Sequence, residues 1–318
     1  MSSMNGHSLA ARFVLVVATL LLVLSPARGE DAFKAFKQLD GSVKMPKLNA
    51  FSPNMGTAIQ PSSARNVSLE ARLTGDGEAM QQGLSWRVFS PIPGADGKLP
   101  LLASAEGGSA DFQLSPGDYF VNVSFGRAGA TKKLTIPTAG DVEKQVLVLD
   151  AGGILLNAVS GPDTRIPAKD LKFDVYSSEA QADGERGLVL ADVPADTIVR
   201  LNAGTYHIVS EYGAVNAVVR ADIKVEAGKL TEAMIQHRAS QINLKLVSEA
   251  GGEAIADTAW SVLTGSGDIV AESVSAFPVM VLAEGTYTAV ARNKEKIYQK
   301  DFTVDAGRNE DVEILLTQ

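Results

Sequence analysis

Three histidines, at positions 7, 207 and 237, are the first candidates for acid–base or metal chemistry in this chain. His7 lies in an N-terminal segment that we expect to be removed, so a three-histidine metal site is excluded. His207 falls at the solvent-facing phase of an expected strand, and His237 lies where two sequence repeats meet. We expect both side chains to be structural or solvated. The sequence therefore predicts no metal site.

The motifs of hydrolases and of calcium loops are incomplete. A Ser-His-Asp triad on a nucleophile elbow needs a Gly-x-Ser-x-Gly turn, whereas residues 265–267 read only as a hairpin tip. Asp-Gly pairs at 76–77, 96–97 and 183–184 lack the spaced acids and distal glutamate of a calcium loop. The chain holds 37 acidic residues, but no spacing singles out a catalytic pair. We predict no enzyme, no catalytic residue and no cofactor.

Aromatic rings on a sheet surface are the remaining route to ligand binding, because carbohydrate is commonly held on such platforms. Aromatic residues make up only 6% of the chain, and both tryptophans occupy a repeated strand position at which phenylalanine replaces one of them. This interchange favours core filling there, since a core requires mainly apolar volume. Phe125, Tyr212 and Tyr298 lie at or beyond strand ends and are the better platform candidates. Each of them could equally cover the edge of a sandwich.

Residues 1–29 read as a secretory signal peptide. Arg12 precedes an apolar run from Phe13 to Leu24, and Ala27 and Gly29 supply the small residues of a cleavage site. The run is shorter than the about 20 residues that a bilayer-spanning helix needs. The alternative is an uncleaved anchor. Both interpretations predict an exported protein, either periplasmic or at the cell surface.

Residues 30–65 form a leader of different composition. Phe33, Phe36 and Leu39 are spaced by three residues, which predicts one apolar face on a short amphipathic helix. So short a helix is not stable alone, and we expect it to pack against the first repeat. The alternatives are a partner, or a membrane contact through residues 30–45 or an uncleaved signal.

Cysteine content and net charge limit the cellular compartments and the classes of partner that fit this chain. The chain contains no cysteine, which excludes disulfides, thiol nucleophiles and thiolate metal sites, and favours a bacterial envelope for an exported β protein. The net charge is −8, and lysine and arginine form no clustered run. Nucleic acid is therefore excluded as a partner, because phosphate neutralisation needs a basic face.

Three landmarks recur in one order through the last two-thirds of the chain: a strand aromatic, the phrase Leu-x-x-Gly-x-Tyr, and an Ala-Gly turn. The aromatic residues are evenly spaced. Such self-similarity predicts an array of repeated folding units, which we place at 66–150, 151–238 and 239–318. The landmarks are Trp86, Phe173 and Trp260; Gly117 with Tyr119, Gly204 with Tyr206 and Gly285 with Tyr287; and Gly140, Gly228 and Gly307.

Apolar residues within each repeat alternate with a period of two. Tyr119, Val121, Val123 and Phe125 show the pattern, with polar residues between them. Alternation of this kind predicts half-buried strands, and Gly-rich turns separate them. About seven short strands per repeat predict an all-β protein of three tandem immunoglobulin-like antiparallel β-sandwiches, following a signal peptide and a short leader.

The phrase has a physical interpretation of its own. Its glycine permits a positive φ, and its tyrosine can place the ring in the core while the hydroxyl bonds to the backbone of the turn, as in a tyrosine corner. On these residues the region 66–318 resembles tandem bacterial immunoglobulin-like, carboxypeptidase-regulatory-like and transthyretin-like β-sandwich repeats. The resemblance implies an exported module array, and such modules serve as spacers, adhesin parts, sugar binders or accessory domains.

We therefore predict a non-catalytic structural or protein-interaction protein that binds an envelope or surface protein through sheet faces and edge strands. The alternative is an adhesin-like protein that binds carbohydrate or an envelope polymer. An interaction protein should show apolar patches or bare edges outside its core, and a sugar binder should show exposed rings.

Overall fold

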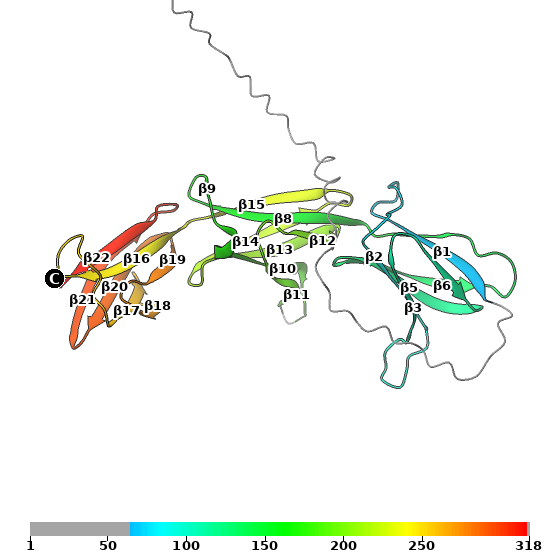
Figure 1. The fold of residues 1–318 in the computed structure, drawn as a ribbon, viewed down its shortest axis with the longest axis horizontal. Coiled ribbons are helices and arrows are strands. Elements are labelled where there is room, and N and C mark those ends of the chain that lie inside the picture. The colour runs from blue at the N-terminus through cyan, green and yellow to red at the C-terminus, as the bar shows by residue number, and fades with distance from the viewer. Residues whose placement is uncertain (1–63, 183, 317–318) are drawn as a thin grey trace, which may run out of the picture.

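The computed structural model describes residues 64–182 and 184–316, and their strands form three β-sandwich modules. The predicted signal peptide and all but the end of the predicted leader lie outside the described residues. Module 1 comprises β1–β7, module 2 comprises β8–β15, and module 3 comprises β16–β22. Figure 1 shows the modules following one another along the long axis of the molecule. The all-β, three-sandwich prediction is confirmed.

The strands have the following bounds. Module 1 contains β1 (Arg65–Arg72), β2 (Leu84–Phe89), β3 (Leu101–Gly107), β4 (Ala110–Leu114), β5 (Gly117–Phe125), β6 (Ala128–Ile136) and β7 (Gln145–Val148). Module 2 contains β8 (Ala151–Ser160), β9 (Thr164–Arg165), a short 3₁₀ turn η1 (Ala168–Asp170), β10 (Leu171–Ala180), β11 (Arg186–Val193), β12 (Ile198–Asn202), β13 (Gly204–Tyr212), β14 (Ala217–Val225) and β15 (Leu230–His237). Module 3 contains β16 (Ala239–Val247), β17 (Thr258–Thr264), β18 (Ile269–Val274), β19 (Val279–Ala283), β20 (Gly285–Asn293), β21 (Lys296–Val304) and β22 (Glu310–Leu315).

Each module packs a small sheet against a four-stranded sheet in the same topology. The small sheets have the orders β4-β1-β7, β12-β8-β15 and β19-β16-β22, and in module 2 the short strand β9 also pairs with β8. The four-stranded sheets have the orders β3-β2-β5-β6, β11-β10-β13-β14 and β18-β17-β20-β21. The repeated topology shows that the three modules are copies of one folding unit.

One strand pair in every module is parallel, which corrects the expectation of purely antiparallel sandwiches. The first strand pairs in parallel with the last strand, as β1 with β7, β8 with β15 and β16 with β22. Parallel first and last strands mean that the chain enters a module at one end and leaves it at the other. This direction of travel places consecutive modules in line, as Figure 1 shows.

The repeated aromatic residues lie at the centres of the three cores. Trp86, Phe173 and Trp260 are all buried, each on the inner face of its four-stranded sheet. Burial of an indole requires a partner for its N–H. The Nε1 of Trp86 donates to the carbonyl of Gly108 at 2.8 Å, and that of Trp260 donates to the carbonyl of Ser275 at 2.9 Å. Phe173 fills the equivalent core position of module 2 and needs no such acceptor.

The phrase forms the same turn three times. Its glycines have φ angles of +148°, +158° and +157°, outside the range that residues with a Cβ readily adopt. The hydroxyls of Tyr119, Tyr206 and Tyr287 each donate to the carbonyl four residues earlier, at 2.9, 3.0 and 2.9 Å. The backbone contact expected of a tyrosine corner is therefore present in every module.

Candidate functional site: the joints between modules

Two joints connect the modules, and both place a hairpin of one module against the phrase of the next. Gly126, the first residue after β5, has a φ of +64°, and a Cβ added there would lie 2.9 Å from Cβ of Arg200. Gly213, the first residue after β13, has a φ of +71°, and its added Cβ would lie 2.7 Å from Cβ of Val281. Arg200 and Val281 each precede the leucine that opens a phrase. The two joints therefore use one geometry, in which glycine permits the close backbone approach.

The phrase also holds the linker between modules. The amide of Ala203 donates to the carbonyl of Asp150 at 2.6 Å, and the amide of Glu284 donates to the carbonyl of Arg238 at 2.8 Å. Ala203 and Glu284 occupy the same position of the phrase, directly before its glycine. Each joint thus ties its linker to the module that follows through an equivalent hydrogen bond.

The Ala-Gly turn supplies a second linker contact. The amide of Gly228 donates to the carbonyl of Ala151 at 2.8 Å, and the amide of Gly307 donates to the carbonyl of Ala239 at 3.0 Å. These linker carbonyls belong to the first residue of β8 and of β16. The phrase and the Ala-Gly turn therefore both bind the linker that comes from the preceding module. They also form turns within their own sandwich.

The joint between modules 1 and 2 is strengthened by two side chains of module 2. The amide of Asn202 donates to the carbonyls of Gly129 and Leu149 at 3.1 and 2.7 Å, and its oxygen accepts from the amide of Gly129 at 3.2 Å. The guanidinium of Arg200 lies over the ring of Phe125, 4.7 Å from its centroid. Burial lowers the pKa of Arg200 from its ordinary value.

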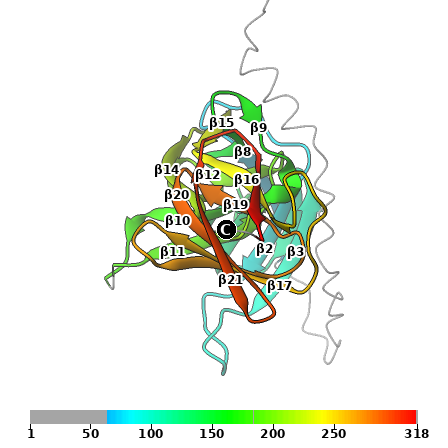
Figure 2. The same ribbon diagram turned by 90° about the vertical axis from the view of Figure 1, so that its left-hand side faces the viewer.

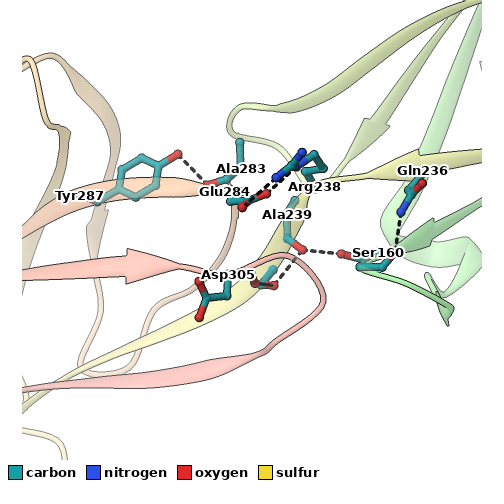
Figure 3. Close-up of polar contacts among 10 residues, drawn as sticks. Ser160, Gln236, Arg238, Ala239, Ala283, Glu284, Tyr287 and Asp305 are labelled. Atoms are coloured by element: carbon teal, nitrogen blue, oxygen red, sulfur yellow. Dashed lines mark hydrogen bonds and ion pairs between the residues drawn. The ribbon is translucent and has the colours of Figure 1, made fainter.

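The joint between modules 2 and 3 carries an ion pair at its surface. Arg238 binds Glu284 through two hydrogen bonds of 2.6 and 3.0 Å, drawn in Figure 3. Hydrogen bonding to Arg238 lowers the pKa of Glu284, and the same pair raises the pKa of Arg238. Exposed pairs contribute little stability, so this contact orients the linker more than it holds the joint. On the module 2 side, the hydroxyl of Ser160 donates to the carbonyl of Ala239.

Asn216 joins the hairpin of module 2 to the phrase of module 3. Its Nδ2 donates to the hydroxyl oxygen of Tyr287 at 3.0 Å, and its Oδ1 accepts from the amide of Ala283 at 2.9 Å. In the joint between modules 1 and 2, the bridging asparagine is Asn202, which belongs to the second module of the pair. Asn216 instead belongs to the first module of its pair. Both joints are nevertheless closed by an amide side chain that bridges two modules.

The two histidines of the described residues take structural positions. His237 is fully buried, and its Nε2 lies 2.8 Å from Oγ of Ser210 while the Tyr212 ring contacts it edge-on at 5.9 Å. Burial lowers the pKa of His237 to about 4. His207 lies on the outer sheet face, with its Nδ1 2.7 Å from the carboxylate of Asp222. The Ser210–His237 pair is enclosed in the core of module 2, out of reach of a substrate.

The expected ligand platforms are not exposed. Phe125, Tyr212 and Tyr298 are all buried, and each belongs to or borders the core of its own module. Phe125 and Tyr212 are the last residues before the two joint hairpins, so the neighbouring module also covers that end of the strand. The three rings therefore correct the expectation of surface binding, because each side chain belongs to the buried core of its own module.

The hairpin glycines were missed by the sequence analysis, although a signal for them exists. Gly126 and Gly213 each follow an aromatic residue that closes the strand begun by the phrase. Aligning the hairpins by that aromatic would have paired the two glycines. Their contact partners could not have been found in this way, because the partners lie in a different module.

Replacing Gly213 by alanine should open the joint between modules 2 and 3. The new Cβ would overlap Val281, and both this variant and the control Gly251→Ala carry the cost of about 1 kcal/mol for a residue with positive φ. Hydrogen exchange at the amide of Ala283 measures the joint, because that amide donates to Asn216 across it. Gly251 has φ +73° and open space around it, so its variant should leave this exchange unchanged. Equal exchange in the two variants would contradict the steric explanation.

Exposed apolar side chains lie on the edge strands of the described modules and on their connections. The strands β3, β11, β18 and β19 are edge strands, and they and their connections carry most of the large apolar residues exposed in the described chain. Figure 1 shows β3, β11 and β18 on the lower side of the rod, and Figure 2 shows β3 and β11 on opposite flanks. These residues are Ile92, Leu99, Leu101, Leu102, Leu188, Ile269, Val274, Phe277 and Val279.

Module 3 also has a shallow depression on the outer face of its four-stranded sheet. Its volume is about 580 Å³, and Val274 and Ile297, exposed by 84% and 67%, are among its lining residues with Ala259 and Ser261. Ala259, Val274 and Ile297 lie in register across neighbouring strands. Among residues 64–182 and 184–316, no cluster of three or more metal-ligating side chains is poised to hold an ion. None of the described residues forms a helix with the length and hydropathy needed to cross a bilayer.

Fold and joints together define a tandem β-sandwich repeat protein. The family model described as the Rhizobiales growth-associated tandem repeat domain matches residues 241–316, which lie within module 3. A search of curated proteins found no match.

Three of the solved structures that match this chain are the following. The TIE protein of Bacillus anthracis is 15% identical over 80% of this chain, with a TM-score of 0.24, and the chain spans half the length of that protein. A streptococcal ancillary pilin is 12% identical, with coverage of 79% of this chain and 98% of its own and a TM-score of 0.27. The minor pilin GBS52 of Streptococcus agalactiae is 13% identical, with coverage of 54% and 95% and a TM-score of 0.30.

Proposed function

We propose that this chain is an exported, non-catalytic rod that holds protein-interaction surfaces at set positions in the bacterial envelope, in the periplasm or at the cell surface. The observation that carries the proposal is the repetition of one joint. Gly126 against Arg200 and Gly213 against Val281 place both pairs of modules in the same contact. A chain selected only to carry separate domains has no need of such a joint, because a flexible linker would suffice.

The edge strands supply the interaction surfaces of the proposed rod. Val274 and Val279 lie on the bare edges of β18 and β19, and Phe277 lies between these strands. An extended segment of a partner can pair with an open edge while its side chains contact the apolar residues beside it. The family model that matches part of module 3 is described as growth-associated, which supports a role of this surface in growth.

The experiment is affinity capture from the envelope of growing cells, with the mature chain as bait. Val274→Lys and Val279→Lys should each lose the captured protein, because an edge lysine opposes strand pairing. Met234→Lys is the matched control for module 3, since Met234 is comparably exposed but lies on β15, an edge strand of module 2. Capture that survives both edge substitutions, or that is lost equally in the Met234 variant, would contradict the edge proposal.

Carbohydrate binding is the second candidate, and one surface favours it. Tyr176 lies on the outer face of module 2, in register with His207 on one side and Leu188 on the other. Its hydroxyl is 3.5 Å from the carboxylate of Asp174, and Asp222 accepts from His207 in the same row. A partly exposed ring beside polar groups suits a sugar. Retention of envelope polysaccharide that is lost in Tyr176→Ala would support this candidate over the first.

A further inference from the structure

We propose that the outer face of the four-stranded sheet of module 3 binds the same face of a second copy of this chain, in a two-fold symmetric contact held by two ion pairs between Glu272 of one copy and Arg292 of the other. This inference adds a contact between identical chains to the proposed rod. It concerns a sheet face and a second copy, whereas the proposed function concerns open strand edges and a different protein. The two proposals can therefore fail separately.

The depression on this face has a floor of small residues from the inner strand β17. Ala259 and Ser261 flank Trp260, so their side chains point outward while the indole points into the core. Val274 of β18 and Ile297 of β21 line the depression on either side and are largely exposed. Removing such apolar surface from water favours association with a surface that fits it.

The depression is a local feature of module 3, because the other modules carry polar or charged residues at both floor positions. In module 1 these positions hold Ser85 and Arg87. In module 2 they hold Lys172 and Asp174, and Lys172 forms an ion pair at 3.5 Å with Asp192 beside it. Each residue that lines the depression belongs to module 3, the last module of the rod in Figure 1. The joint with module 2 therefore leaves this face open.

One acid and one base stand on opposite sides of the floor, and both are exposed. Glu272 lies on β18 in register with Ser261, and Arg292 lies on β20 in register with Ala259. Within residues 64–182 and 184–316 neither side chain forms an ion pair, and Glu272 accepts a hydrogen bond of 3.4 Å from the hydroxyl of Ser261. Both charges are consequently available to a molecule that covers the depression.

This arrangement of charges is complementary to itself. A two-fold axis that crosses the floor midway between Glu272 and Arg292 exchanges their positions, so the acid of each copy meets the base of the other. The same axis brings Val274 of each copy beside Ala259 of the other, where the small side chain leaves room for it. A second copy supplies the opposite order of charges by symmetry alone, and charge complementarity therefore selects it as the occupant.

The test is sedimentation equilibrium of the purified mature chain. The wild type should dimerise, and Glu272→Arg and Arg292→Glu should each weaken dimerisation by about tenfold or more, because each homodimer then contains two like-charged contacts. An equimolar mixture of the two variants should dimerise as tightly as the wild type, since every contact in the mixed dimer again joins an acid to a base.

Glu106→Arg is the matched control. Glu106 is an exposed acid on β3, the strand of module 1 that corresponds to β18, so its variant should dimerise like the wild type. Thermal unfolding of each variant shows that it is folded before association is compared. Three results would overturn the inference: a wild type that stays monomeric at about 1 mM, single variants that dimerise like the wild type, or a mixture of the two variants that remains monomeric.

Discussion

Replacing Trp260 by alanine will lower the free energy of unfolding of module 3 by about 3–5 kcal/mol. Its side chain is almost fully buried among the inner residues of both sheets, and its indole is hydrogen-bonded to Ser275. Removing it leaves a large cavity and an unpaired carbonyl. A loss of this size is comparable with the whole stability of a small module, so module 3 should unfold at much lower urea concentration.

The measurement separates the modules by their two tryptophans. In Trp260→Ala the remaining tryptophan is Trp86, so fluorescence follows module 1 and circular dichroism follows all three modules. The matched control is Trp260→Phe, which reproduces the residue of module 2 and should cost about 1–2 kcal/mol through the lost hydrogen bond and volume. Equal losses in the two variants would contradict the role of Trp260 as core volume.

Acidification will weaken module 2 between pH 6.5 and about 4 through His237. Its folded-state pKa is about 4, whereas an unfolded histidine has a pKa near 6.5, because burial opposes the charged form. Between these values the unfolded chain binds the proton more readily, so stability is complete above pH 6.5 and falls as the pH decreases. The loss at pH 4 should reach at most about 3 kcal/mol, since one pKa unit corresponds to about 1.4 kcal/mol.

The control for this pH dependence removes the histidine and its partner together. In Ser210→Ala/His237→Phe the buried hydroxyl is not left unpaired, so the double variant tests the titration itself. Urea unfolding of module 2, followed by hydrogen exchange in β13 and β15, should lose its slope between pH 6.5 and 4 in this variant. An unchanged slope would assign the acid sensitivity to carboxylates such as Glu226, whose pKa is lowered by hydrogen bonding to Lys229.

Much of the fold could be predicted from patterns and contacts within short segments of the sequence. The alternation of Tyr119, Val121, Val123 and Phe125 has the period of a strand, and the structure places these residues on β5. The phrase predicted its own turn, because a glycine with positive φ and a tyrosine bonding four residues back are contacts within one short segment. The parallel pairing of the first and last strands was missed, since its partners are far apart in sequence.

The candidate site was less predictable for the same reason. Phe125 and Tyr212 stand at strand ends, where the sequence pattern predicted exposed rings, but both are buried in the cores of their modules. Asn216 and Asn202 are ordinary turn residues by sequence. Their bridging hydrogen bonds depend on a neighbouring module that no local pattern describes.

The amino-acid sequence by itself determined the all-β class, the three repeats, the absence of thiol chemistry and the core position of Trp86, Phe173 and Trp260, because each follows from composition, period or short-range contacts. Only the tertiary structure decided that the modules stand in line, that Gly126 and Gly213 build one repeated joint, and that the expected platforms are buried. Those features arise from contacts between residues far apart in the chain, whose geometry is set when folded modules pack together.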